Sequence, residues 1–298
     1  VQGMAGIRSK AGILQIVRAG RFWMIMSRSP IALTEQHKKL IRSGWGDKTA
    51  DEVIVEKMLY DSDGEEVEGY LAYPKVIGDK LPLIIWNRGG NLKEGAIDEF
   101  LASGMYGEIA SWGYVVLASQ YRKNEEFGGS DVNDILNLIP LAEDLPFCNT
   151  GLIGMEGWSR GGMMAYRVLT LTDRIKCAVI VSGLANLQRW KKDRSKLSHI
   201  YPHIFDVMNE PETVVQLKAR SAVMFADRIS SKTAMLLIHG TEDTIVPHSD
   251  SVEMKELLSG LDRIVELQLI KDGDHYLRKF RKEVYVLRRN WFDNFLKK

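Results

Sequence analysis

Short apolar runs alternate with segments of helical pattern along most of the chain. The apolar runs read LPLIIW, YVVLAS, GLIGMEG, CAVIVS, TAMLLIH and VELQLI, and each is rich in Val, Ile and Leu. Runs of this length and composition are typical of strands that are buried on both faces. Strands that alternate with helices predict an α/β domain, in which helices cover both faces of a mostly parallel sheet.

The segment before the first of these runs has a different pattern. Residues 52–74 read as two strands joined at Asp63-Gly64, a dipeptide that favours a tight hairpin. The hairpin would add antiparallel strands at one edge of the sheet. We therefore expect about eight strands in one domain, over residues 34–298.

The first thirty-three residues do not continue this pattern. They are basic and partly apolar, and Arg18 and Arg21 interrupt any apolar segment of a signal peptide. We interpret residues 1–33 as an N-terminal extension, either non-native or disordered, and leave them out of the functional argument.

One interval between two predicted strands is too long for a simple crossover. Residues 184–232 predict an insertion with short helices. Ligands of open α/β sheets bind at the carboxyl ends of the strands, so an insertion there can roof a pocket. We expect a cap near the active site, and the alternative is an insertion without a role in binding.

Composition excludes several classes of partner. The chain has 298 residues, with 40 basic and 39 acidic side chains and a formal net charge of +1. This balance gives no reason to expect a nucleic-acid partner, and no apolar stretch reaches the ~20 residues of a membrane span. The two cysteines, Cys148 and Cys177, form no disulfide framework, and Cys177 lies in an apolar run that predicts a buried thiol. We expect a cytoplasmic protein, and the sequence does not indicate an oligomeric state.

The motif with the clearest chemistry is GWSRG, residues 157–161. It follows the apolar run LIGME and precedes a helical pattern, and a G-x-S-x-G motif in this context holds its serine on a sharp turn. The alternative is a tight turn that merely needed small residues. We predict that Ser159 is a nucleophile.

A serine nucleophile needs a base and an acid that orients the base. Asp243 follows the run TAMLLIH, and His275 follows the last run, VELQLI. Both therefore come after later strands, in the order Ser, acid, His. We predict a triad of Ser159, Asp243 and His275. Glu242 is an alternative acid, and a turn residue and a loop cap are the structural alternatives for Asp243 and His275.

An acyl-transfer site also needs donors for the negative charge that develops on the carbonyl oxygen. The backbone N–H of Arg160, directly after the nucleophile, is one candidate. The other should come from the loop after LPLIIW, where Gly89 and Gly90 let backbone amides approach a substrate. A flexible turn is the alternative role of these glycines.

Taken together, these motifs resemble the catalytic domain of the prolyl oligopeptidase family, within the α/β-hydrolase fold. The resemblance covers roughly residues 52–298. It depends on IIWNRGG, QYRKNEEFGGSDVNDI, GWSRGGMMAY, ARSAVMFADRI, LLIHGTEDTIVP and DGDHYL. It implies that Ser159, Asp243 and His275 form the catalytic triad.

The chain departs from the family pattern at several points. Many members have a tyrosine before the paired glycines and another after the nucleophile, where this chain has Arg88 and Arg160. The resemblance then implies that a backbone amide replaces the tyrosine hydroxyl. About fifty residues precede the hairpin, so we expect no β-propeller of the kind that restricts many members to short peptides.

The two arginines raise a further hypothesis. Arg88 and Arg160 could form a positive pocket for substrates with a carboxylate, or each could pair with an internal acid such as Asp131, Asp134 or Glu156. We favour internal pairing. We place Arg88 and Trp158 in the substrate pocket.

The sequence thus predicts a serine hydrolase, a prolyl-oligopeptidase-like peptidase or esterase that cleaves small esters or short peptides through an acyl-enzyme. A carboxylesterase without peptidase activity is one alternative. A non-catalytic ligand-binding homologue is another. We expect no metal and no organic cofactor, since neither a dinucleotide fingerprint nor a phosphate loop is present.

Overall fold

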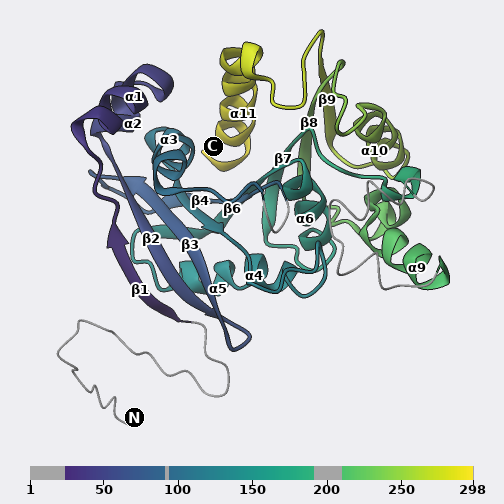
Figure 1. Cartoon of the computed structure of the whole chain (residues 1–298), viewed down its shortest axis with the longest axis horizontal. Helices are drawn as coiled ribbons and strands as arrows, with labels where there is room; N and C mark the ends of the chain where they lie inside the picture. Colours follow the sequence, from purple (N-terminus) through teal and green to yellow (C-terminus); the bar gives the residue numbers. More distant parts are fainter. Residues whose placement is uncertain (1–23, 91–93, 191–209, 298) are drawn as a thin grey trace.

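The computed structural model describes residues 24–90, 94–190 and 210–297. These residues form one nine-stranded sheet with helices on both faces (Figure 1). The strands are β1 Ile25–Pro30, β2 Val53–Ser62, β3 Glu65–Pro74, β4 Leu81–Asn87, β5 Val115–Ser119, β6 Cys148–Trp158, β7 Ile175–Val181, β8 Ala234–Gly240 and β9 Val265–Ile270. The α-helices are α1 Glu35–Trp45, α2 Asp47–Asp51, α3 Glu99–Ser111, α4 Val132–Leu136, α5 Leu138–Glu143, α6 Arg160–Val168, α9 Glu210–Arg220, α10 Ser249–Gly260 and α11 Arg281–Leu296.

The strand order is β1-β2-β3-β5-β4-β6-β7-β8-β9. The pairs β1–β2, β2–β3 and β3–β5 are antiparallel, and every pair from β5 to β9 is parallel. The predicted hairpin is confirmed, and Asp63 and Gly64 have φ values of 58° and 87°. Positive φ at both central residues is what the favoured two-residue hairpin turn requires. The mostly parallel α/β sheet is also confirmed.

The ninth strand lies in the segment that we had set aside. Residues 25–30 pair with β2, and the Ile31 N–H continues this pairing to the Val55 carbonyl at 2.9 Å. The assignment of residues 1–33 to an extension is therefore wrong for this part, and residues 1–23 lie outside the described ranges. Side chains of β1 are exposed or half-buried. The strand has no apolar alternation because its backbone hydrogen bonds to β2, not a buried face, hold it in place.

Two separate cores explain the unbroken apolar runs. One face of the parallel strands packs against α3 and α11, through side chains such as Tyr106 and Phe292. The other face packs against α4, α5, α6 and α10, through side chains such as Leu138 and Met163. A strand that is covered on both sides needs apolar residues at every position.

The predicted insertion contains short helices where the structure describes it. Between β7 and β8 lie α9 and three 3₁₀ turns, at Leu187–Trp190, Ala222–Met224 and Ala226–Arg228. Residues 191–209, the centre of the predicted cap, lie outside the described ranges. Within the ranges that are described, no helix is both long and apolar enough to cross a membrane.

Candidate active site

Ser159 sits at the turn between β6 and α6. Its backbone has φ 54° and ψ −119°, a conformation that L side chains rarely adopt. Such strain costs about 1–3 kcal/mol and persists only where the surroundings impose it. Here the Ser159 N–H donates to the Val181 carbonyl at 2.9 Å, and its own carbonyl accepts from the Leu184 N–H at 3.1 Å. The sharp turn that the motif predicts is present.

The glycines of the motif make this turn sterically possible. A Cβ at Gly157 would lie 2.2 Å from the Gly161 carbonyl oxygen, and a Cβ at Gly161 would lie 2.1 Å from the Asn87 carbonyl oxygen. Real Cβ contacts are never so short. The motif therefore needs both glycines for the close approach of β4, β6 and α6.

The structure brings His275 and Asp243 together. His275 Nδ1 lies 2.7 Å from Asp243 Oδ2, and the Asp243 carboxylate is fully buried. The other carboxylate oxygen accepts the N–H groups of Ile245 and Val246, both at 2.9 Å. These bonds fix the carboxylate, which in turn fixes the imidazole. Because Nδ1 faces the acid, Nε2 is the nitrogen that can take up a proton.

Asp243 is held in its charged form. Burial acts to raise its pKa, but hydrogen bonds from His239 and His275 outweigh that effect, so the pKa lies well below its ordinary value. The carboxylate thus stays ionised at neutral pH.

The sequence did not reveal the role of His239. His239 Nε2 lies 3.1 Å from Asp243 Oδ2 and 3.0 Å from the Val246 carbonyl oxygen, and Nδ1 lies 2.7 Å from Ser251 Oγ. Two acceptors at Nε2 require the proton there. The imidazole of His239 therefore donates a second hydrogen bond to the Asp243 carboxylate. The alternative acid, Glu242, is exposed and does not replace Asp243 beside His275.

Candidate oxyanion donors lie on two segments beside Ser159. Arg160 begins α6, where the first N–H groups of a helix have no carbonyl partner within the helix. A Cβ at Gly89 would lie 3.2 Å from the Ser159 Cβ, so the Gly89 backbone runs directly past the nucleophile. Gly90 has φ 76° and packs against the Glu94 carbonyl. Gly89 is thus the closer of the two predicted glycines to Ser159.

The arginine side chains do not form a positive pocket. Arg88 and Arg160 are 3% and 2% exposed, and both guanidinium groups bond to the carboxylate of Glu125. Arg160 also donates to Asp131 Oδ2 at 2.6 Å. The hypothesis of a carboxylate-selective pocket is therefore wrong, because internal acids pair with both side chains, whereas the place of Arg88 in the substrate pocket stays a prediction. Internal pairing is confirmed with Asp131.

The other two acids considered for this role pair elsewhere. Asp134 bonds to Arg122 at 2.7 Å, and Glu156 bonds to Arg288 at 2.9 Å. Glu125 lies in a loop, where no periodicity of the sequence shows which side chains turn inward, so its pairing could not be predicted.

Trp158 lines a cavity of about 310 Å³ between α3, α11 and the loop after β9. Its indole N–H donates to Glu156 Oε1 at 2.6 Å. The lining also includes Tyr276. This cavity thus contains sequence neighbours of Ser159 and His275, but neither of those two residues. The place of Trp158 in a substrate pocket stays a prediction.

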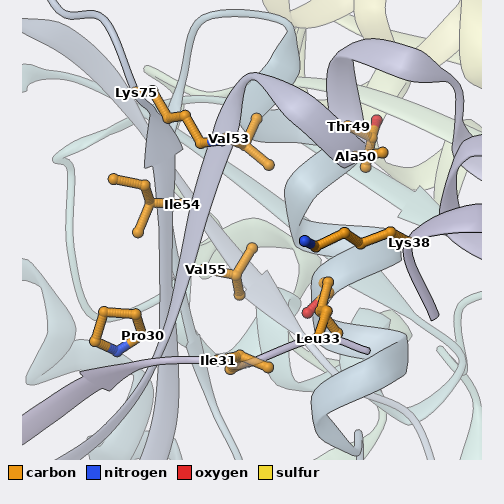
Figure 2. A pocket seen from close by; sticks show the side chains of 11 residues that line it. Pro30, Ile31, Leu33, Lys38, Thr49, Ala50, Val53, Ile54, Val55 and Lys75 are labelled. Atoms are coloured by element: carbon orange, nitrogen blue, oxygen red, sulfur yellow. The ribbon is translucent and has the colours of Figure 1, made fainter. Parts of the chain in front are cut away.

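A smaller cavity of about 220 Å³ lies away from these residues (Figure 2). Val53 lines this cavity and pairs with Pro74 across β2 and β3. Both residues lie at the end of the sheet where the parallel strands begin. The ammonium groups of its two lysines bond to other groups: Lys38 to Glu35 at 2.8 Å, and Lys75 to the Asp51 carbonyl at 2.6 Å. Ser159 lies at the other end of the sheet, after the carboxyl end of β6, so this cavity is not the candidate active site.

Comparison with known proteins identifies a family. The model of the prolyl oligopeptidase family matches residues 110–298, which include Ser159, Asp243 and His275. Among curated proteins, the chain is 26% identical over 226 residues to a Bacillus subtilis (strain 168) protein named uncharacterized peptidase YtmA. That match covers 74% of this chain and 85% of the relative.

Solved structures share the fold. An acylaminoacyl peptidase from Pyrococcus horikoshii superimposes with a TM-score of 0.70 at 23% identity, over 83% of this chain and 42% of that one. A puromycin-hydrolyzing peptidase from Mycobacterium tuberculosis superimposes with a TM-score of 0.68 at 18% identity, over 82% of this chain and 40% of that one. The chain thus spans less than half the length of these two structures. Identities this low establish the α/β-hydrolase fold and not a shared substrate.

Proposed function

Because the chain belongs to the prolyl oligopeptidase family of serine hydrolases, we propose that it is a serine peptidase and that Ser159 is its nucleophile. In the first step, Ser159 Oγ attacks the carbonyl carbon of the scissile bond while His275 Nε2 takes the hydroxyl proton. The carbon–nitrogen bond then breaks, and His275 returns the proton to the leaving amine. Water, activated by the same imidazole, hydrolyses the acyl-enzyme and regenerates Ser159.

Asp243 and the backbone amides complete this proposal. Asp243 orients the His275 ring and stabilises the imidazolium that forms, since its own low pKa prevents it from taking the proton. The N–H groups of Arg160 and Gly89 hold the oxyanion of each tetrahedral intermediate.

One observation carries the proposal furthest. A strained serine at the end of β6 lies at the same edge of the parallel sheet as a hydrogen-bonded His275–Asp243 pair after β8 and β9. A turn that only needed small residues has no reason to hold a serine at φ 54°. A buried, ionised acid that is hydrogen-bonded to a histidine serves to orient a catalytic base, which favours catalysis over ligand binding alone.

Short peptides are the substrates that family membership favours, and small esters are the second class. We propose that the site accepts aminoacyl or dipeptidyl groups, with carboxylesterase activity as the alternative. Neither class needs a charged pocket, and Arg88 and Arg160 provide none. We further propose a cytoplasmic location, which the two free, buried thiols support; detection of the protein in a secreted fraction would contradict it.

The test compares two substrate panels. Aminoacyl and dipeptidyl nitroanilides and p-nitrophenyl esters are offered to the wild type and to Ser159→Ala. Anilide cleavage that Ser159→Ala abolishes supports the peptidase. Serine-dependent turnover of esters alone would assign a carboxylesterase, and binding without turnover in both proteins would favour the non-catalytic homologue.

A further inference from the structure

A buried brace connects the two segments that carry the proposed oxyanion donors. It consists of Tyr121 and Glu125, in the loop between β5 and α4, together with the arginines 88 and 160 that they contact. Tyr121 and Glu125 are each 4% exposed. Neither residue belongs to the triad or to the proposed oxyanion donors.

Glu125 links both segments through one carboxylate. One oxygen accepts from Arg88 Nη2 and the other accepts from Arg160 Nη1. Arg88 directly precedes Gly89, and Arg160 directly follows Ser159. Arg160 also binds Asp131, so that these four side chains form a buried charge network. Removal of the Glu125 charge would leave buried arginines with less counter-charge.

Tyr121 fixes the peptide group that carries the Gly89 N–H. Its hydroxyl donates to the Arg88 carbonyl oxygen at 3.0 Å. The Arg88 carbonyl and the Gly89 N–H belong to one planar trans peptide and point in opposite directions. The Gly89 N–H therefore points away from Tyr121. Burial raises the pKa of Tyr121, so the hydroxyl keeps its proton and remains a donor.

Arg88 holds the next peptide, which contains the Gly89 carbonyl and the Gly90 N–H. Arg88 Nη1 donates to the Gly89 carbonyl oxygen at 3.1 Å, and Arg88 Nη2 donates to the Gln120 carbonyl at 2.8 Å. Both guanidinium groups also lie over the Tyr121 ring, with 4.7 Å from its centroid to the guanidinium carbon of each arginine. The Arg88 carbonyl thus accepts a hydrogen bond from Tyr121. The Gly89 carbonyl accepts one from Arg88, whose guanidinium group bonds to Glu125.

From this geometry we infer that Tyr121 and Glu125 are positioning residues for the oxyanion hole of the proposed peptidase. They act through Arg88 and Arg160 and aim the N–H groups of Gly89 and Arg160 at one point beside Ser159. In this chain, buried arginines behind the loop orient a backbone donor. This inference rests on the proposed function, because it presupposes the oxyanion.

Two conservative variants test the inference. Tyr121→Phe removes one hydroxyl and keeps the ring that both guanidinium groups contact, and Glu125→Gln keeps the shape and removes the charge. Since loss of one oxyanion donor lowers kcat about 10²–10³-fold, we expect a misaimed donor to lower kcat about tenfold or more. KM should change by less than about threefold, because the bond forms in the transition state.

The matched control is Glu126→Gln. Glu126 is the neighbouring carboxylate, its side chain is exposed, and it accepts from the Ser130 N–H at 2.8 Å. We expect wild-type kcat and KM from this variant. Urea unfolding of each variant shows how much folded protein is present, so that kcat refers to folded enzyme alone.

A second readout separates aiming from mere stability. Peptide aldehydes form a tetrahedral adduct with a serine nucleophile, whereas the matching carboxamides bind without one. We expect Tyr121→Phe to weaken the aldehyde about as much as it lowers kcat and to leave carboxamide affinity unchanged. Equal loss for both inhibitors, or wild-type kcat in both variants, would overturn the inference. If Glu125→Gln does not fold, Tyr121→Phe decides the question alone.

The failure of this inference can be told from failure of the proposed function. Labelling of wild-type Ser159 by a fluorophosphonate is measured first. If the wild type is not labelled, the proposed function and the brace both fall. If it is labelled and the two variants match it in kcat, only the brace falls.

Discussion

The chemistry of the site depends on how a few side chains hold Asp243. Its carboxylate accepts hydrogen bonds from two imidazoles and two backbone N–H groups. This environment lowers its pKa below the ordinary carboxyl value of about 3.9. A lowered pKa in the folded state means that its contribution to stability is complete above the ordinary value. The contribution is lost only as the pH falls through the lowered one.

The lowered pKa of Asp243 also determines how activity should depend on pH. Because the pKa of Asp243 is lowered, its carboxylate stays ionised between about pH 5 and 7 and adds no second protonation to the acid side of the pH profile. We expect log(kcat/KM) to fall with a slope of about one on the acid side. A pH series with a nitroanilide substrate checks this. A slope near two would mean that Asp243 protonates in the same range.

The glycines of the nucleophile turn make a second prediction at the residue scale. Gly157→Ala places a Cβ 2.2 Å from the Gly161 carbonyl oxygen, so the turn must open and move Ser159. A displacement of about 1 Å can cost about 10²-fold in rate. We expect kcat/KM to fall by about that factor.

The matched control for this change is Gly78→Ala. No atom lies within 4 Å of a Cβ at Gly78, so this variant should keep wild-type kcat/KM and unfold at the wild-type urea concentration. Full activity of Gly157→Ala would show that the turn tolerates a side chain, contrary to the packing described above.

At this scale, the sequence predicted what spacing and order can reveal. Ser159, Asp243 and His275 each follow an apolar strand, and their order matches that of the fold. The partners of Arg88 and Arg160 could not be found in the same way, since Glu125 lies in an irregular loop. His239 was visible at a strand end, but only the structure shows that its ring turns toward Asp243.

Among the secondary-structure elements, α11 is fastened to the sheet by a buried ion pair. Arg288 is 7% exposed and bonds to Glu156 on β6 and to Glu108 on α3. Glu156 is fully buried and also accepts the indole N–H of Trp86 at 2.9 Å. A charged group in this position is costly unless its partner remains.

Arg288→Met should therefore destabilise the protein strongly. Loss of one partner from a buried pair costs about 3–5 kcal/mol, because the other charge stays buried and unpaired. Urea unfolding of the purified variant measures the change. Arg289→Met is the control on the same helix, since its partner Asp293 lies at 3.4 Å and Arg289 is exposed.

An exposed pair contributes about 0–1 kcal/mol, so we expect the control to stay within that range. Similar losses in both variants would show that the Arg288 pair does not fasten the helix.

The elements themselves were predicted where periodicity or apolar runs mark them. The parallel strands follow from the apolar runs that a two-sided core requires, and the helices between them follow from the segments of helical pattern that alternate with those runs. Strand β1 could not be predicted, because an edge strand with exposed side chains carries no apolar pattern. Its position depends on pairing with β2, which is a tertiary property.

For the whole molecule, the sheet gathers the site from distant parts of the sequence. Parallel strands β4, β6, β8 and β9 lie in one sheet (Figure 1). The Gly89 loop, Ser159, Asp243 and His275 follow the carboxyl ends of these strands and therefore meet at one end of the sheet. The loop after β5 contacts this end of the sheet through Glu125, which binds Arg88 and Arg160. Because parallel strands end at the same edge, the chain order of strands was enough to predict the gathering. It was not enough to predict which internal charges would neutralise Arg88 and Arg160.

The most direct test of the account is covalent labelling of Ser159. The folded wild-type protein is treated with a fluorophosphonate, digested, and mapped by mass spectrometry, with Ser159→Ala and heat-unfolded wild type as controls. The account predicts one modified residue, Ser159, in the folded wild type and no modification in either control. An unlabelled wild type, or labelling that persists in Ser159→Ala, would contradict the assignment of Ser159 as an activated nucleophile.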